Sequence, residues 1–283
     1  MPELPEVETV CRGLAPALAG RRIAHVKLGR RDLRIPFPPK FAARLTGCKV
    51  IALKRRAKYI LAQLDNGEVL AIHLGMSGRL TLSGKGTAKF HLDAATDAKH
   101  DHVVIDFDKG PRLTFNDPRR FGLMTLIPAE DLEHHKLFKH LGLEPLEPEF
   151  TGEVLRARFA GRRTSLKAAL LDQRLIVGVG NIYASEALHR ARLSPERPAG
   201  NLTRAQAQRL ANSVREVLNT AIAVGGSTLR DFAGTGGELG YFQHRFAVYD
   251  RAGEACLRDK CRGRISRIVQ GGRSSFFCPI CQR

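Results

Sequence analysis

The first stretch of the chain carries apolar residues at helical spacing. Four of them recur at intervals of three and four positions and fall on one face of a helix: Val7, Val10, Leu14 and Leu18. Pro5 is compatible with this helix, because a proline in the first turn lacks only an N–H group that has no partner within the helix. The pattern therefore predicts a helix that begins almost at residue 2.

A different pattern follows between about residues 22 and 126. Short runs rich in β-branched and aromatic residues alternate with turn signals, for example at residues 59–62 and 103–107. The segment Asp65-Asn66-Gly67 has the composition of a hairpin turn. Several such runs at hairpin spacing predict two antiparallel sheets packed face to face, which is a β-sandwich.

Helical spacing returns in the second half of the chain. Thr203 and Gln206 are three residues apart, as in a capping box, and Gly225-Gly226 provides a stop signal. Between them lies one apolar stripe, formed by Leu210, Val214, Val217, Leu218, Ala221 and Ile222. This pattern predicts a long amphipathic helix.

These patterns predict an α+β chain with four parts. The first is a domain over residues 1–130, with an N-terminal helix and a two-sheet antiparallel β-sandwich. Residues 131–150 mix Glu, His, Lys and Pro and suit a linker or hinge. A helical domain over residues 151–244 and a small cysteine-containing unit over residues 245–283 complete the prediction.

The charge balance indicates an anionic partner. The chain has 46 Lys and Arg against 28 Asp and Glu, a net charge of +18, with an ordinary globular apolar fraction of 43%. Nucleic acid is the favoured partner, over a basic surface that serves solubility or an anionic membrane. The sequence has neither an apolar run long enough to span a membrane nor the features of a signal peptide at its start. We therefore expect a cytoplasmic, nucleoid-associated protein.

Four of the six cysteines have the spacing of a metal site. Cys256 and Cys261 are separated by four residues, Cys278 and Cys281 by two, and sixteen residues lie between the pairs. Four thiolates in two close pairs predict one structural Zn²⁺, rather than unbound thiols, a disulfide or a catalytic zinc with an open position. Five nearby arginines suggest that this zinc finger faces phosphate: Arg258, Arg262, Arg264, Arg267 and Arg273. The remaining thiols, Cys11 and Cys48, are interpreted as packed or inert.

The N-terminus offers a second candidate for chemistry. If Met1 is removed, Pro2 presents a secondary α-amine, and α-amines have a lower pKa than lysine side chains. Such an amine can attack a sugar C1′ and form an iminium, which acidifies the C2′ proton and prepares elimination. Glu3 and Glu6 could move protons there or hold charge. Taken alone, however, acidic residues in a first turn also simply complement the helix dipole.

Six ordered segments resemble bacterial formamidopyrimidine-DNA glycosylases. They are Pro2–Thr9, Arg56–Tyr59, His73–Gly78, Asn116–Gly122, Gly178–Glu186 and the four cysteines. The resemblance implies an N-terminal β-sandwich, a helical domain with a helix-two-turn-helix motif, and a zinc finger with four cysteine ligands. One departure is visible, since the first cysteine pair is usually separated by two residues in this family, and here by four.

The resemblance also implies catalytic roles. Pro2 would be the Schiff-base nucleophile, Glu3 the proton donor for base release, and Glu6 their support. Lys58 would assist β-elimination, although on its own it would be interpreted as a solubility charge on an edge strand. Arg273 matches a finger arginine that is associated with δ-elimination and phosphate contact.

Further residues would bind DNA according to the same resemblance. Met76, Arg119 and Phe121 match the three residues that enter the duplex where the damaged nucleotide leaves it. Without the resemblance, Met76 and Phe121 would be assigned to the core. His100 and Arg163 match further family positions that contact DNA. Asn181, at a helix start preceded by glycine, could present its amide to a phosphate, and Lys167 is expected as an additional contact. For His100 and Lys167 a solvated surface position is the alternative.

The implied activity is the removal of oxidised purines, such as 8-oxoguanine and formamidopyrimidines, from damaged double-stranded DNA by a monomeric enzyme. Strand cleavage by β,δ-elimination would follow. One alternative is the sister endonuclease VIII type, which acts on oxidised pyrimidines and usually opens Pro-Glu-Gly-Pro-Glu; Leu4 favours the purine branch. The other alternative is a non-catalytic zinc-finger DNA-binding protein. Residues 233–241, with four glycines, are predicted to form the lesion-recognition loop.

Overall fold

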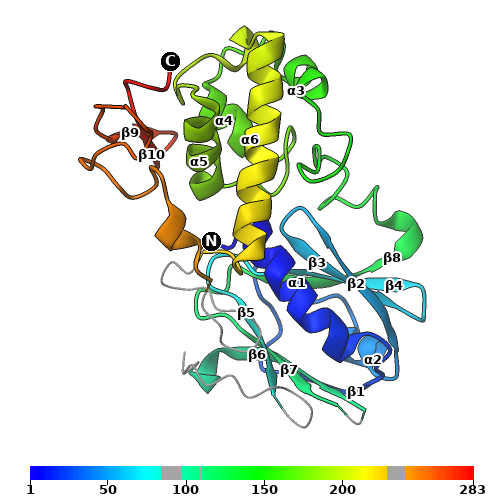
Figure 1. Cartoon of the computed structure of the whole chain (residues 1–283). Helices are drawn as coiled ribbons and strands as arrows, with labels where there is room; N and C mark the ends of the chain where they lie inside the picture. The colour runs from blue at the N-terminus through cyan, green and yellow to red at the C-terminus, as the bar shows by residue number, and fades with distance from the viewer. Residues whose placement is uncertain (84–96, 109, 228–239) are drawn as a thin grey trace. The chain divides into compact units, whose positions relative to one another are not determined.

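The computed structural model describes residues 1–83, 97–108, 110–227 and 240–283 (Figure 1). Most of the predicted lesion-recognition loop, residues 233–239, lies outside these ranges. The chain divides into two compact units, one formed by residues 1–139 and 224–241 and the other by residues 140–223 and 242–283. The division near residue 139 falls in the segment that separates the two sequence patterns.

The first unit contains two four-stranded antiparallel sheets, as predicted. One has the strand order β1 (Ile23–Leu28), β6 (Asp101–Phe107), β7 (Arg112–Asn116) and β5 (Arg79–Ser83). The other has the order β2 (Val50–Arg56), β3 (Tyr59–Leu64), β4 (Glu68–His73) and β8 (Leu123–Pro128). The described residues of this unit form the helices α1 (Leu4–Leu18) and α2 (Phe41–Leu45) and the short 3₁₀ helices η1 (Ala98–His100) and η2 (Ala129–Asp131).

One hydrophobic core joins both sheets to α1. It takes side chains from each sheet, for example Ile60 and Phe115, and the predicted apolar face of α1, and all of these are buried. Helix α1 begins directly after Glu3, and Pro5 lies in its first turn without disturbing it. The N-terminal residues are therefore held on a packed helix.

The second unit is helical and carries one small hairpin. Its helices are α3 (Gly152–Phe159), α4 (Leu166–Leu171), α5 (Asn181–Ala191) and α6 (Arg204–Ala223), with short 3₁₀ helices η3 (Ala199–Asn201) and η4 (Phe242–Arg245). Strands β9 (Ser266–Gln270) and β10 (Arg273–Phe277) form the antiparallel hairpin. None of the described helices combines the length and the apolar character that crossing a bilayer requires.

The predicted capping box of α6 is confirmed. The Thr203 N–H donates to Gln206 Oε1 at 3.0 Å, and the Gln206 N–H donates to Thr203 Oγ1 at 3.2 Å. These two bonds satisfy backbone donors that the first turn of a helix leaves without a partner. The apolar stripe of α6 is buried along most of its length.

Candidate functional site

Two buried carboxylates follow Pro2. Glu3 is 4% exposed and Glu6 is 2% exposed. Glu6 Oε2 accepts a hydrogen bond from the Glu3 N–H at 2.8 Å, and Glu6 Oε1 accepts one from the Ser227 N–H at 2.8 Å. Glu6 thus does more than complement the helix dipole, because it fixes the backbone next to Pro2 and joins it to the segment that follows α6.

Residue 226, directly before Ser227, must be glycine for the hydrogen bond between Ser227 and Glu6 to form. Gly226 has φ +80°, and a Cβ atom added there would lie 2.9 Å from Glu6 Oε1. A larger residue would therefore be strained and would also push against the buried carboxylate. In the sequence this glycine was interpreted only as a helix stop, and its approach to Glu6 was not predicted.

Lys58 lies in the tight turn between β2 and β3. Ala57, the other turn residue, has a left-handed φ of 53°, and Lys58 is only 6% exposed. Burial, and after it the nearby positive charge of Lys58, lowers the pKa of His73 to about 4. Lys58 is therefore a buried cation beside a neutral imidazole, and it is not the exposed edge-strand charge that was the alternative.

His73 connects this cation to the loop that carries Met76. Its Nδ1 accepts a hydrogen bond from the Gly75 N–H at 2.9 Å. Gly75 has φ +66°, and a Cβ atom there would lie 2.3 Å from the carbonyl carbon of Phe121. The loop between β4 and β5 therefore touches the loop between β7 and β8 at a point where only glycine fits.

Asp117 holds these two loops together. It is 0% exposed; its Oδ1 accepts a hydrogen bond from Ser77 Oγ at 2.6 Å, and its Oδ2 accepts one from the Gly122 N–H at 2.8 Å. Ser77 Oγ in turn accepts a hydrogen bond from the Arg119 N–H at 3.2 Å. Neither Ser77 nor Asp117 was predicted as a functional residue, although both lie in segments that carry the resemblance.

The fixed loops present an aromatic ring and a guanidinium group. Phe121 is 44% exposed, and Arg119 Cζ lies 5.2 Å from the centre of its ring, in a cation–π contact. Phe121 is therefore not a core residue, which was the alternative for it. Met76 is partly buried, and so is His100, whose carbonyl accepts a hydrogen bond from the Asp117 N–H at 3.0 Å.

In the second unit, the predicted DNA-binding residues lie around β10. Asn181 begins α5, and its Nδ2 donates to the Ser274 carbonyl at 3.0 Å. Lys167 is 1% exposed, and its Nζ donates to the same carbonyl and to Ser275 Oγ, each at 2.8 Å. The next residue back along the chain, Arg273, is exposed. A contact of Lys167 with DNA would thus be indirect, through the hairpin that it holds.

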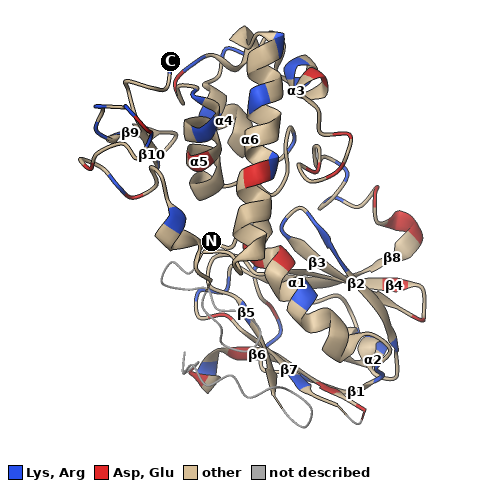
Figure 2. Cartoon of the chain, viewed as in Figure 1, with Lys and Arg blue, Asp and Glu red and all other residues tan. Residues whose placement is uncertain are grey.

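Arg163 lies apart from this group. It is exposed in the segment between α3 and α4, where it lines a surface hollow with Arg162 and Gly200. Basic residues are in fact distributed over both units, on strands as well as on helices (Figure 2). The high positive charge is therefore available on both parts of the chain.

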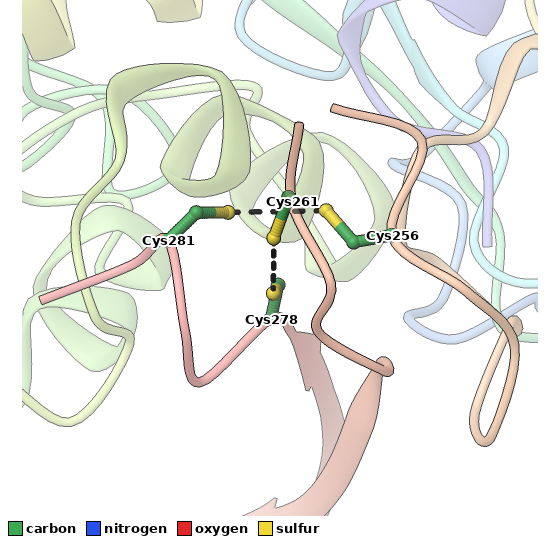
Figure 3. A group of neighbouring side chains, drawn as sticks. All are labelled: Cys256, Cys261, Cys278 and Cys281. Atoms are coloured by element: carbon green, nitrogen blue, oxygen red, sulfur yellow. Dashed lines mark hydrogen bonds between the residues drawn. The ribbon is translucent and has the colours of Figure 1, made fainter. Parts of the chain in front are cut away.

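The four clustered cysteines fit a tetrahedral metal site (Figure 3). Their sulfur atoms all lie within 4.8 Å of one another, with 3.9 Å between Cys256 and Cys281 and 3.6 Å between Cys261 and Cys278. Four sulfurs at about 2.3 Å from a zinc ion would be separated by about 3.8 Å. All six cysteines of the chain are in the described residues, and none forms a disulfide. The four-residue spacing of the first pair is therefore compatible with the predicted site.

We expect Cys278→Ser to remove the metal. Cys278 is 0% exposed and belongs to the small core of the finger, which is made of few apolar residues. Structural zinc contributes about 10–16 kcal/mol to such small domains. Elemental analysis after dialysis should therefore show that the zinc content falls from one ion per chain to nearly none.

Cys48→Ser is the matched control for this prediction. Cys48 is also a buried thiol, but it lies in the first unit, where its Sγ contacts the Arg44 carbonyl at 3.1 Å. This variant should keep one zinc per chain. A Cys278→Ser protein that still holds one zinc would rule out the four-cysteine site.

Three family models match the chain in order. The model described as formamidopyrimidine-DNA glycosylase N-terminal domain matches residues 1–124. The model described as formamidopyrimidine-DNA glycosylase H2TH domain matches residues 141–233, and that of a zinc finger found in FPG and IleRS matches residues 253–283.

Individual proteins are similar over the whole length. The formamidopyrimidine-DNA glycosylase of Cereibacter sphaeroides is 57% identical over 283 residues, with 100% of both chains covered. The crystal structure of the FPG protein from Thermus thermophilus is 40% identical and has a TM-score of 0.85, covering 99% of this chain and 98% of that one. A Lactococcus lactis FPG mutant, solved in complex with DNA that contains Fapy-dG, is 31% identical and has a TM-score of 0.86, with 100% of both chains covered.

Proposed function

This chain belongs to the formamidopyrimidine-DNA glycosylase family, and we propose that it excises oxidised purines from duplex DNA with Pro2 as the nucleophile. It is a DNA glycosylase and abasic-site lyase of base excision repair. The observation that carries the proposed chemistry is the placement of the buried Glu3 and Glu6 directly after Pro2. The Fapy-dG in the complex of the L. lactis relative supports an oxidised purine as the substrate.

The first step replaces the bond between sugar and base. With Met1 removed, the Pro2 nitrogen attacks C1′, the glycosidic bond breaks, and the base leaves with a proton from Glu3. The attached nitrogen gives up its proton, the C1′–O4′ bond breaks with O4′ taking up a proton, and the nitrogen lone pair forms an iminium at C1′. The tight hydrogen bond from the Glu3 N–H to Glu6 would keep the nucleophile and the proton donor in register.

The second step cleaves the strand. The iminium withdraws electrons, so the C2′ proton becomes acidic, and its loss expels the 3′ phosphate by β-elimination. Lys58, a buried cation on the β2–β3 turn, is proposed to assist this step. A δ-elimination then removes the C4′ proton and expels the 5′ phosphate, and Arg273 is proposed to bind that phosphate. Hydrolysis of the iminium then returns Pro2.

Extrusion of the damaged nucleotide requires groups that fill the space left behind. We assign this role to Met76, Arg119 and Phe121, because an exposed aromatic ring on a rigid loop can stack where the base was. His100, Arg163 and Asn181 are proposed to contact the DNA backbone. Bound zinc would supply rigidity to the finger that carries Arg273, with Cys256, Cys261, Cys278 and Cys281 as its ligands.

The remaining proposals concern organisation and setting. We propose that residues 1–130 form the catalytic domain, residues 131–150 the hinge, residues 151–244 the helix-two-turn-helix domain and residues 245–283 the zinc finger. The protein would act as a monomer on damaged duplex DNA, and it would reside in the cytoplasm at the nucleoid.

An incision assay separates this proposal from its alternatives. Duplexes of one sequence would carry 8-oxoguanine, a formamidopyrimidine or thymine glycol at the same position. We expect rapid cleavage of the two purine substrates, with phosphate left at both ends of the gap as β,δ-elimination requires. Preference for thymine glycol would indicate the endonuclease VIII type, and binding without cleavage would indicate a DNA-binding protein.

We expect Phe121→Ala to slow excision from duplex DNA by about 10- to 100-fold, which corresponds to about 1.4–2.8 kcal/mol in the barrier. The deficit should shrink when the lesion lies in a mispair, because part of the unstacking cost is already removed. Met76→Ala should act in the same direction. Arg119→Ala should instead weaken discrimination of the opposite base.

Thermal melting checks the cause of the Phe121 effect. Since Phe121 is 44% exposed, its truncation should leave the melting temperature within about 2 °C of wild type. Ile51→Ala truncates a side chain that is 52% exposed on β2 and serves as a control with normal activity. A large drop in melting temperature, with equal loss of activity on all substrates, would instead show that Phe121 stabilises the fold.

A further inference from the structure

The four-residue spacing of the first cysteine pair brings an arginine side chain to helix α5. Arg258 lies between Cys256 and Cys261, and its Nη2 donates to the His189 carbonyl at 2.6 Å. The longer spacing thus does more than close a loop, because it places a guanidinium group on the backbone of His189.

A histidine from helix α5 contacts a sulfur of the first pair. His189 is 6% exposed, and its Nε2 lies 3.4 Å from Cys256 Sγ. A metal-bound thiolate can only accept a hydrogen bond, so His189 must carry its proton on Nε2 and donate it. His189 lies outside the sequence of the finger, and the contact therefore joins the finger to the helical part of the same unit.

Hydrogen-bond donors to the cysteine sulfurs stabilise the metal-bound site, because the site is charged and partly buried. Four thiolates around Zn²⁺ leave a net charge of about −2. Cys278 is 0% exposed and Cys256 is 7% exposed, so water solvates these two sulfurs poorly. A donor on Cys256 would stabilise this sulfur, which lies 3.9 Å from that of Cys281.

Helix α5 also holds the finger at two further points. Asn181, at its start, donates to the Ser274 carbonyl of the hairpin at 3.0 Å. Glu186 accepts hydrogen bonds from the N–H groups of residues 247–249, at 2.9, 3.0 and 2.8 Å. These contacts dock the polypeptide of the finger on α5. The contact of His189 is different, because its partner is the sulfur of a metal ligand. This contact therefore depends on whether the metal is bound.

We propose that His189 retains the zinc ion by donating a hydrogen bond to the thiolate of Cys256, and that Arg258 holds His189 in place through its carbonyl. The two residues would thereby couple zinc loading to the order of α5. A finger without metal would lose the thiolate that His189 binds, and the last turn of α5 would loosen. Conversely, replacement of His189 or Arg258 would weaken the hold on zinc although all four ligands remain.

Zinc release to an excess of a chromophoric chelator tests the retention role directly. His189→Phe keeps an aromatic ring but removes the donor, and we expect release to become about 10- to 100-fold faster. Arg258→Gln should accelerate release in the same direction. Arg264→Gln is the matched control, since Arg264 donates to the Gly253 carbonyl within the same finger at 2.8 Å, and its release rate should stay within about twofold of wild type.

The protein with Co²⁺ in place of zinc gives a spectroscopic signature. The sulfur-to-cobalt charge-transfer band depends on hydrogen bonds to the thiolates, so it should shift in His189→Phe and stay unchanged in Arg264→Gln. His189→Gln retains an N–H donor and should restore part of both the band position and the release rate. If His189→Phe does not fold, the band position and the release rate of His189→Gln test the proposal in its place.

Hydrogen exchange tests the coupling. Amides of residues 186–191 should lose protection when zinc is removed from the wild type, and they should already be less protected in zinc-loaded His189→Phe. Wild-type release rates in both His189→Phe and Arg258→Gln would overturn the retention role. Unchanged protection in the loaded His189→Phe protein would overturn the coupling.

Discussion

Replacement of Pro2 by glycine is expected to slow strand cleavage by about 100-fold or more, while affinity for a lesion-containing duplex stays within about twofold. The glycine variant still presents an amine, but a primary one without the ring that fixes its direction of attack. A misplaced nucleophile loses the advantage of orientation, which is worth factors of this size. Binding should persist because the groups proposed to grip DNA are unchanged.

Single-turnover cleavage of an 8-oxoguanine duplex, with enzyme in excess, measures this effect. Intact mass spectrometry must first show that Met1 is absent from each preparation, since Met1 would block the amine. Pro16→Ala is the control, because Pro16 is an exposed proline farther along the same helix. Equal single-turnover rates for wild type and Pro2→Gly would remove Pro2 from the mechanism.

Replacement of Glu3 by glutamine should separate the two activities of the enzyme. Base excision is expected to fall by about 10²- to 10⁴-fold, because glutamine cannot give a proton to the leaving base. Cleavage of a duplex with a preformed abasic site should fall by less than about tenfold, since no base remains to be released. The substitution preserves the shape of a side chain that is 4% exposed, so a large packing defect is not expected.

Glu8→Gln provides the comparison for Glu3→Gln. Glu8 is a carboxylate on the same helix, paired with Arg12 at 2.7 Å and with Arg55 at 2.8 Å. Its replacement should change both activities by less than about twofold, because glutamine keeps an oxygen that can accept from Arg12 and Arg55, and no step of the reaction is assigned to Glu8. If Glu3→Gln lowers excision and abasic-site cleavage by the same factor, Glu3 does not act as the donor for base release.

Local patterns in the sequence were sufficient for the elements that depend on neighbouring residues. The spacing of Val7, Val10 and Leu14 predicted α1, and Thr203 with Gln206 predicted the start of α6. The cysteine spacing predicted a cluster that the structure contains. In each case the interaction that decides the structure joins residues whose separation in the sequence has a characteristic value.

Contacts between distant segments could not be predicted in this way. Asp117 binds Ser77 across forty positions, and Lys167 reaches Ser275 across 108. A lysine that donates both to a carbonyl and to a hydroxyl inside a unit has the same local pattern as a surface lysine. Phe121 shows the converse, since its apolar character suggested the core, yet the loop that Asp117 fixes leaves it exposed.

Trapping with borohydride tests the central claim most directly. Wild-type enzyme, with Met1 removed, is mixed with an 8-oxoguanine duplex and reduced, and the covalent product is digested and mapped by mass spectrometry. The proposed mechanism predicts a reduced adduct between the deoxyribose and the nitrogen of Pro2, in the N-terminal peptide. An adduct on a lysine peptide, such as the one that contains Lys58, or cleavage without any trapped complex, would contradict it.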